Sequence, residues 1–204
     1  YATVQIGDQC WFAENCRYLP EVSALSSSSH TEPRYYVVGY EGTDVSAAME
    51  TDYYATLGVL YNWSAVLTED ICPSGWHIPS GDEVNELVEY IGGAEVAGYA
   101  LKSTSGWVAF DGETAGNGSN SSGFNALPSG GYSPYGGGFF FELESMDPLV
   151  GTSTHFWLST TAGPDGNGTP AGDRFGLIGN FDFVSSGVYD SRFGQKARCL
   201  LDAE

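Results

Sequence analysis

Four cysteines and three histidines are the side chains of this sequence best suited to metal binding or nucleophilic chemistry. The histidines, His30, His77 and His155, are scattered, and no two cysteines have the Cys-x-x-Cys spacing typical of zinc sites. The sequence therefore argues against a zinc site. Two disulfides in an exported domain are the better interpretation of the cysteines.

The two expected disulfides differ in the length of the loop that each would close. Cys10 with Cys16 would close a small local loop. Cys72 with Cys199 would join the entrance of a helix to the last strand, a long closure that the chain-entropy model values at roughly 4–5 kcal/mol.

The common catalytic motifs are missing from the sequence: it contains no Gly-x-Ser-x-Gly, His-Glu-x-x-His or P-loop pattern. His77 lies between Trp76 and Ile78, a setting more typical of a packed, hydrogen-bonded histidine than of a general base. We therefore expect a protein that is not an enzyme and has no catalytic residues.

The charge balance restricts the partners. The 26 acidic against 7 basic residues give a net charge of −19, which argues against nucleic acid and against an anionic membrane surface. Such an excess of carboxylates suits a secreted protein and leaves room for calcium, whereas no other cofactor is expected. Asp111, Glu113 and Asn117 in the polar loop 111–123 could hold calcium, but their spacing is not that of an EF-hand, and turn formation is the favoured use.

One helix is clearly predicted. Ser80 and Glu83 form a capping box at its start, and Gly92-Gly93 supplies a left-handed stop. An apolar stripe at helical spacing predicts one docked face, formed by Val84, Leu87, Val88 and Ile91. A second, shorter amphipathic helix is expected from about residue 96 to 103.

The remaining chain reads as strands, turns and loops. With 28 glycines and 14% aromatic residues, it suits an α+β architecture of two helices, short antiparallel strands and long loops within a single domain, 1–204. Most of 19–56 is expected to be a surface insertion containing a strand at 35–38. Other strands are expected in a hairpin at the start and at 155–160, 173–178, 180–184, 186–190 and 195–201. No run of 18 apolar residues occurs, so we expect no direct membrane insertion, and the chain to be a mature protein or an excised domain.

Several segments, in order along the chain, resemble the Fibrobacter succinogenes major paralogous domain family: YATVQIGDQCWFAEN, LGVLYNWSAV, CPSGWHIPSGDEVNEL, LKSTSGW, SGFNALPSGGY, FWLST and RCLLD. The resemblance implies a secreted or cell-surface bacterial domain, often a module of a larger surface protein. It also implies a C-type lectin-like fold, with Cys72–Cys199 as its core disulfide. Cys10 and Cys16 stand where the family usually has apolar residues, which suggests an extra disulfide particular to this chain.

In C-type lectin-like folds the loops and short strands of the second half form the ligand surface. In this chain that half interleaves aromatic with hydrogen-bonding side chains, which give contact area at low entropic cost. The alternative is that alternate aromatic residues of the strands only fill the core. The predicted ligand-binding residues are Asp173, Arg174, Phe175, Asn180, Phe181, Asp182, Tyr189, Asp190 and Arg192.

These residues suggest a bacterial or phage ligand-binding or adhesion module whose partner is a protein or glycan on a cell surface. Some such domains have this segment rewritten by a diversity-generating retroelement, and a near-copy of the DNA beside the gene, differing at adenines, would reveal it. The alternative is a carbohydrate-binding lectin. The Glu-Pro-Asn, Gln-Pro-Asp and Trp-Asn-Asp triplets of calcium-dependent sugar lectins are missing, so aromatic stacking is the other route to a sugar. The fold is shared with formylglycine-generating enzymes, but Cys199 has no second cysteine near it in the sequence, as their copper chemistry requires.

Overall fold

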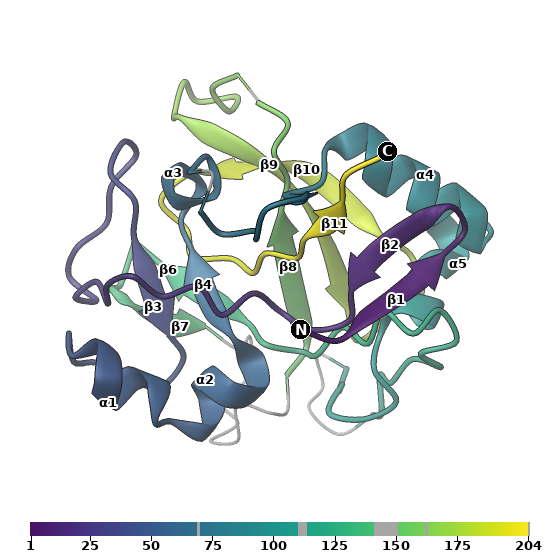
Figure 1. Ribbon diagram of the computed structural model, residues 1–204, viewed down its shortest axis with the longest axis horizontal. Helices are drawn as coiled ribbons and strands as arrows, with labels where there is room; N and C mark the ends of the chain where they lie inside the picture. Colours follow the sequence, from purple (N-terminus) through teal and green to yellow (C-terminus); the bar gives the residue numbers. More distant parts are fainter. Residues whose placement is uncertain (69, 110–113, 141–150, 162, 204) are drawn as a thin grey trace.

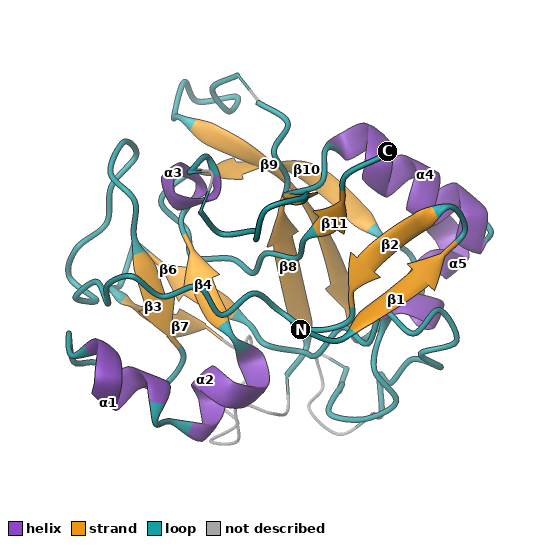
Figure 2. Ribbon diagram, in the orientation of Figure 1, coloured by secondary structure: helices purple, strands orange, loops and turns teal. Residues whose placement is uncertain are grey.

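The structure is a computed structural model that describes residues 1–68, 70–109, 114–140, 151–161 and 163–203. Within these residues, short helices flank four small antiparallel sheets, so the α+β class is confirmed (Figures 1 and 2). The long helices lie beside the first and second sheets, and two short helices lie at the other side of the molecule.

The first sheet has the order β1-β2-β11-β5, formed by Thr3–Ile6, Gln9–Phe12, Leu200–Leu201 and Trp76–His77. The second has the order β10-β9-β8, formed by Ser185–Asp190, Ala171–Ile178 and Ser153–Trp157. The two remaining sheets are pairs: β3 with β4 (Tyr35–Val37, Val59–Tyr61) and β6 with β7 (Gly131–Ser133, Gly138–Phe140).

The two ends of the chain meet in the first sheet. Leu200 of β11 pairs with Trp11 of β2 on one side and with His77 of β5 on the other. The Cys72–Cys199 disulfide, with the two Cα atoms 5.8 Å apart, joins the segment before β5 to the segment before β11. The expected link between the helix entrance and the last strand is therefore confirmed.

The main predicted helix is α4 (Gly81–Ile91), and both hydrogen bonds of its capping box are present. The Glu83 amide donates to Ser80 Oγ at 3.3 Å, and the Ser80 amide donates to Glu83 Oε2 at 2.7 Å. The helix ends at Gly92, whose φ of 123° favours glycine. The second predicted helix is α5 (Ala94–Leu101), directly after it.

The expectation of only two helices is wrong. Three more occur in the described part of the chain, α1 (Val45–Met49), α2 (Asp52–Leu57) and α3 (Trp63–Val66). Their N-cap residues Asp44, Thr51 and Asn62 each accept a hydrogen bond from the backbone three residues on. Helices of four to six residues are too short to show an apolar repeat, and such helices depend on caps and packing.

The strand expected at 180–184 is also wrong, because this segment is the turn that connects β9 to β10. The buried Lys102 fixes that turn: its Nζ donates to the carbonyls of Ile178, Gly179 and Phe181. Of the strand expected at 195–201, only Leu200–Leu201 forms a named strand. The strand expected within 19–56 is confirmed as β3, which is buried against β4.

Among the described residues, two large hydrophobic clusters and a smaller third one form the core. The first surrounds the disulfide and includes Trp157. The second lies between α4, α5 and the second sheet and includes Trp11 and Phe156. Gln9 links β2 to α4, because it accepts from the Trp11 indole at 3.0 Å and donates to the Glu83 carbonyl at 2.9 Å.

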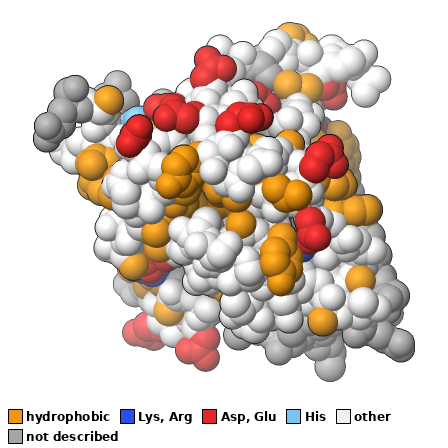
Figure 3. All heavy atoms as spheres, turned by 90° about the vertical axis from the view of Figure 1, so that its right-hand side faces the viewer, with side chains coloured by type: hydrophobic (Ala, Val, Ile, Leu, Met, Phe, Trp, Pro, Cys, Tyr) orange, Lys and Arg blue, Asp and Glu red, His pale blue; other side chains and the backbone are white. Residues whose placement is uncertain are grey.

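The outer face of α4 and α5 shows separate acidic side chains, small apolar patches and very few basic side chains (Figure 3). Tyr90 of α4 and Val96 and Tyr99 of α5 are among the exposed apolar residues. This distribution agrees with the strongly negative composition.

Candidate functional site

The nine predicted ligand-binding residues do not form one site. They are separated by their position along the β9–β10 hairpin and by the side chains that each of them contacts. Three groups result: Arg174, Tyr189, Asp190 and Arg192; then Asp173 and Phe175; then Asn180, Phe181 and Asp182.

The first group lies with Tyr135 and Phe193, and we call these six residues the Tyr135 surface. Tyr135 is 72% exposed, and its hydroxyl donates to Asp190 Oδ2 at 2.9 Å. Arg192 Nη2 donates to the same oxygen at 2.6 Å and to the Tyr135 hydroxyl at 3.2 Å. An exposed ring is thus held in one orientation by a guanidinium and a carboxylate.

Asp190 is the fixed anion of this surface. Its side chain is only 7% exposed, and it accepts three hydrogen bonds from the Arg192 guanidinium and one from the Arg192 amide. Burial by itself would raise the pKa of Asp190, but these hydrogen bonds and the one from Tyr135 outweigh it and lower the pKa. His30 adds a further polar group: its Nδ1 lies 2.8 Å from Ser191 Oγ and 3.7 Å from Asp190 Oδ1.

Phe193 joins the two halves of the surface. Its ring contacts Tyr135 at a centroid distance of 5.8 Å and Tyr189 at 4.6 Å, both nearly edge-on. The Arg174 guanidinium lies over the Tyr189 ring, 3.6 Å from its centroid, which is a cation–π contact. Rings and charged groups at the end of β10 are therefore linked by a continuous series of contacts from Tyr135 to Arg174.

Tyr135, Phe193 and His30 were not among the residues predicted from the sequence. Tyr135 follows β6 in a Ser-Pro-Tyr-Gly turn. Because turns lie at the surface, the aromatic residue in this turn could have been recognised from the sequence as an exposed binding residue. His30 is 160 residues before Asp190 in the chain, and no local pattern connects the two.

Asp173 and Phe175 face the opposite side of β9. They line a hollow of about 210 Å³ together with Val84 and Val88 of α4 and Ser186 of β10. Phe175 is only 1% exposed and belongs to the second core cluster, whereas burial raises the pKa of Asp173. Phe175 thus supplies the apolar floor of this hollow.

Asn180, Phe181 and Asp182 lie at the far end of the hairpin, in the turn held by Lys102. Phe181 is 41% exposed and packs on Phe183, with the ring centroids 4.8 Å apart. The structure therefore places these three residues away from Asp190 and Arg192, which lie at the other end of β10.

The predicted Cys10–Cys16 disulfide is wrong, since both thiols are free. Cys10 is a partly exposed residue of β2, whose neighbour Trp11 faces the core, because alternate strand residues face opposite sides. Cys16 lies beyond the end of β2 and is fully buried beside Cys199. Burial raises the pKa of Cys16 to about 12.

His77 bridges two carboxylates. Its Nδ1 lies 2.6 Å from Asp202 Oδ1 and its Nε2 lies 2.8 Å from Glu83 Oε1. Burial by itself would lower the pKa of His77, but the two hydrogen-bonded carboxylates outweigh it and raise the pKa. His77 thus ties the C-terminal segment to the start of α4, and in its protonated form it donates to both carboxylates.

The residues considered for calcium are only partly described. Asp111 and Glu113 lie outside the described residues. Asn117 Oδ1 accepts a hydrogen bond from the Trp107 amide at 2.9 Å, which is a structural contact within the loop.

The fold and these sites define an α+β domain with a polar–aromatic surface at one sheet end and a disulfide-closed core. Residues 4–172 match the Fibrobacter succinogenes major domain. The chain belongs to this family. No match was found to a curated protein or to a solved structure. Among the helices of the described segments, none has the length and apolar character needed to cross a lipid bilayer.

Proposed function

We propose that this domain is a ligand-binding or adhesion module, and that the Tyr135 surface binds a protein or glycan on a cell surface. The observation that carries the proposal is the preorganised Tyr135–Arg192–Asp190 group. Tyr135 is 72% exposed, yet its hydroxyl, the guanidinium and the carboxylate already hold one another through hydrogen bonds of 2.6 to 3.2 Å.

Rigid aromatic and arginine side chains are the residues that most often dominate binding energy at interfaces. Because Tyr135 is fixed before binding, a ligand meets it with little loss of side-chain entropy. Asp190 neutralises Arg192, and the Arg174 guanidinium lies over the Tyr189 ring, so the surface offers hydrogen-bond donors and ring faces. This chemistry suits a neutral, hydroxyl-rich or peptide ligand.

The architecture supports the same proposal. A terminal strand tied by a disulfide to the entrance of the main helix is the arrangement expected of a C-type lectin-like fold, in which the second half carries the ligand. We propose an exported, cell-surface domain within a larger surface protein, because a disulfide and a strongly acidic composition suit that setting.

The test compares three alanine variants of the whole chain on glycan arrays and on immobilised cell-surface proteins. Tyr135→Ala and Arg192→Ala are expected to weaken binding at least about tenfold, the loss typical of an interface hot spot. Tyr90→Ala is the matched control, because Tyr90 is 67% exposed on α4, away from the Tyr135 surface. Tyr135→Phe keeps the ring and removes the hydroxyl, so it distinguishes their contributions to binding.

Binding that survives Tyr135→Ala and Arg192→Ala but is lost with Tyr90→Ala would contradict this placement of the site. Near-ultraviolet circular dichroism of each variant checks that the fold is retained.

The second candidate function is a carbohydrate-binding lectin. The exposed ring of Tyr135 supports it, since aromatic faces stack on the apolar faces of sugars. Binding to a glycan array in the presence of a chelator would support stacking, and loss of that binding would support the calcium-assisted route. Retention by Tyr135→Phe with loss in Tyr135→Ala would identify the ring as the contact.

We also propose that the segment after Gly172, which carries every residue of this surface except Tyr135, is subject to diversification by a retroelement. The family match ends at Gly172, and the predicted residues begin at Asp173, so the surface strands extend past the matched part of the chain. A near-copy of the corresponding DNA beside the gene, differing at adenines, is the expected evidence.

A further inference from the structure

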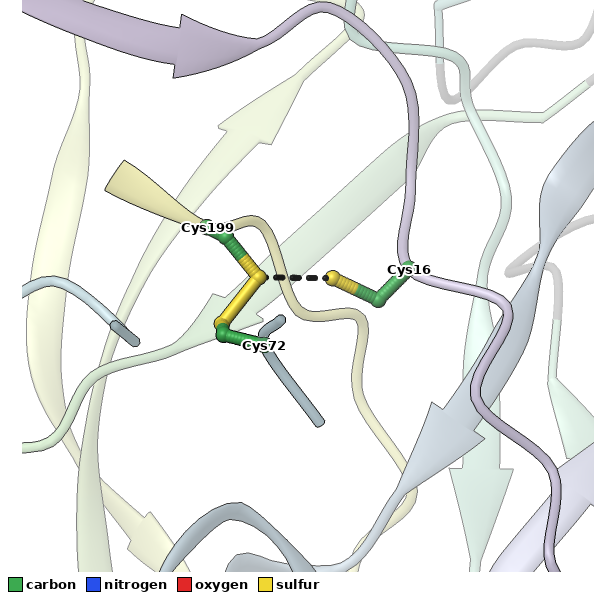
Figure 4. Close-up of side chains that lie close together, drawn as sticks. All are labelled: Cys16, Cys72 and Cys199. Atoms are coloured by element: carbon green, nitrogen blue, oxygen red, sulfur yellow. Dashed lines mark hydrogen bonds between the residues drawn. A yellow bond between two sulfur atoms is a disulfide. The ribbon is translucent and has the colours of Figure 1, made fainter. Parts of the chain in front are cut away.

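Three sulfur atoms meet in the first core cluster, where the free Cys16 lies against the Cys72–Cys199 disulfide (Figure 4). The Sγ atoms of Cys16 and Cys199 are 3.4 Å apart, and all three Sγ atoms lie within 4.8 Å of one another. Within the described ranges, this is the one group of three or more potential metal-binding side chains that comes this close together.

Backbone hydrogen bonds, besides the disulfide, hold the segments that carry Cys16 and Cys199. The Cys16 amide donates to the Ala197 carbonyl at 3.0 Å, and the Phe12 amide donates to the Cys199 carbonyl at 2.9 Å. Cys72 precedes β5, which pairs with β11 through Leu200. A reduced chain that keeps these backbone contacts keeps all three sulfurs in the same small volume.

The spacing suits a thiolate-bound metal. Sulfurs bound at about 2.3 Å around one ion lie about 3.8 Å from each other. The Cys16–Cys199 distance is already close to this value, and side-chain rotation can separate the two sulfurs of the reduced bond. A group of sulfur ligands selects thiophilic ions such as Zn²⁺ and Cu⁺ over Ca²⁺ and Mg²⁺.

The surroundings supply a countercharge and a route of entry. The buried Arg198 lies close enough to Cys16 to interact with it electrostatically, so its positive charge would offset the excess negative charge of three thiolates. Cys72 lines a hollow of about 430 Å³ that is also bordered by Trp76 and His77, and this hollow is the side from which an ion or a fourth ligand would approach the group.

We propose that the reduced domain binds one thiophilic metal ion, Zn²⁺ or Cu⁺, through Cys16, Cys72 and Cys199, and that the disulfide closes this site. A dithiol or phosphine reductant supplies two electrons, and the two sulfurs take up two protons to become thiols. Metal binding then releases one proton from each thiol that becomes a ligand. This inference does not depend on the proposed recognition function.

The test uses the whole chain, reduced with a phosphine under argon, with Cd²⁺ as the probe. The thiolate-to-metal charge-transfer band is expected to saturate at one Cd²⁺ per chain for the wild type and for Cys10→Ser. Cys16→Ser is expected to bind at least about tenfold more weakly, since loss of even a supporting residue around a metal has an effect of that size. The oxidised protein is expected to show no band. Displacement by Zn²⁺ and by Cu⁺ then compares the two ions.

Equal Cd²⁺ affinity of Cys16→Ser and the wild type would overturn the proposal, and so would an equal band in the oxidised protein. Near-ultraviolet circular dichroism from the buried tryptophans monitors the fold throughout. A reduced wild type that loses this signal in the presence of Cd²⁺ would also overturn the proposal, because the folded chain is what brings the sulfurs together.

Discussion

Lys102 and Lys196 show how differently one residue type can be buried in this domain. Both are at most 1% exposed. Lys102 donates to three backbone carbonyls, whereas Lys196 Nζ has no hydrogen-bond partner among the described residues. Burial lowers the pKa of both, and that of Lys196 to about 7. A buried ammonium without a partner opposes folding, because it loses its hydration without compensation.

Lys196→Met is therefore expected to stabilise the domain at pH 6 or below by about 1–4 kcal/mol. An unfolded lysine has a pKa of about 10.4, so between about pH 7 and 10 the unfolded state binds a proton that the folded state does not. The stability of the wild type should then rise with pH in this window, and the advantage of the variant should shrink. Urea unfolding of both proteins at about pH 6 and pH 9.5 measures this. If Lys196→Met stabilised the domain equally at both pH values, the lowered pKa of Lys196 would be contradicted.

At the scale of elements, tertiary hydrogen bonds decide how β9 connects to β10. A strand was expected at 180–184, but Lys102 at the end of α5 draws the carbonyls of Ile178, Gly179 and Phe181 into a turn. Close packing between α5 and this turn also holds the turn in place. A Cβ on Gly98 would lie only 2.6 Å from the Phe183 carbonyl oxygen, so a residue larger than glycine does not fit there. The helix and the hairpin thus fix each other.

Lys102→Met is expected to destabilise the domain by about 2–4 kcal/mol, because three carbonyls lose their shared donor. The loss should appear as a lower midpoint of urea unfolding and as faster amide exchange in α5 and around residue 182. Lys196→Met is the matched control, since it makes the same chemical change at a buried lysine without acceptors. A Lys102→Met protein as stable as the wild type would show that the turn does not need this side chain.

At the scale of the molecule, one covalent bond and one strand join the C-terminal segment to the rest of the chain. The Cys72–Cys199 bond spans 127 residues, and β11 adds the backbone pairing with β2 and β5. The first core cluster is built around this junction. The whole domain is therefore expected to depend on it.

The double variant Cys72→Ala/Cys199→Ala is expected to lose about 5 kcal/mol of unfolding free energy, the loop-closure value for this separation. Cys10→Ala, at a partly exposed thiol, should change stability by less than about 0.5 kcal/mol. Thermal and urea unfolding with and without reductant compare the two. If reductant left the wild type as stable as before, the disulfide would not be the main constraint.

Local signals in the sequence determined the elements that depend on neighbouring residues. The capping box of Ser80 and Glu83, the apolar stripe after it and the stop at Gly92 defined α4, since these interactions span at most a few residues. The pairing of Cys72 with Cys199 was also expected, and the family segments indicated it.

Only the tertiary structure decided which distant residues meet. Tyr135 reaches Asp190 across 55 residues, and Cys16 reaches Cys199 across 183, so no periodicity or motif could relate them. These contacts arise because the C-terminal segment returns to pair with β2 and because Phe193 packs between two rings. Both the Tyr135 surface and the three-sulfur group come from that return of the chain.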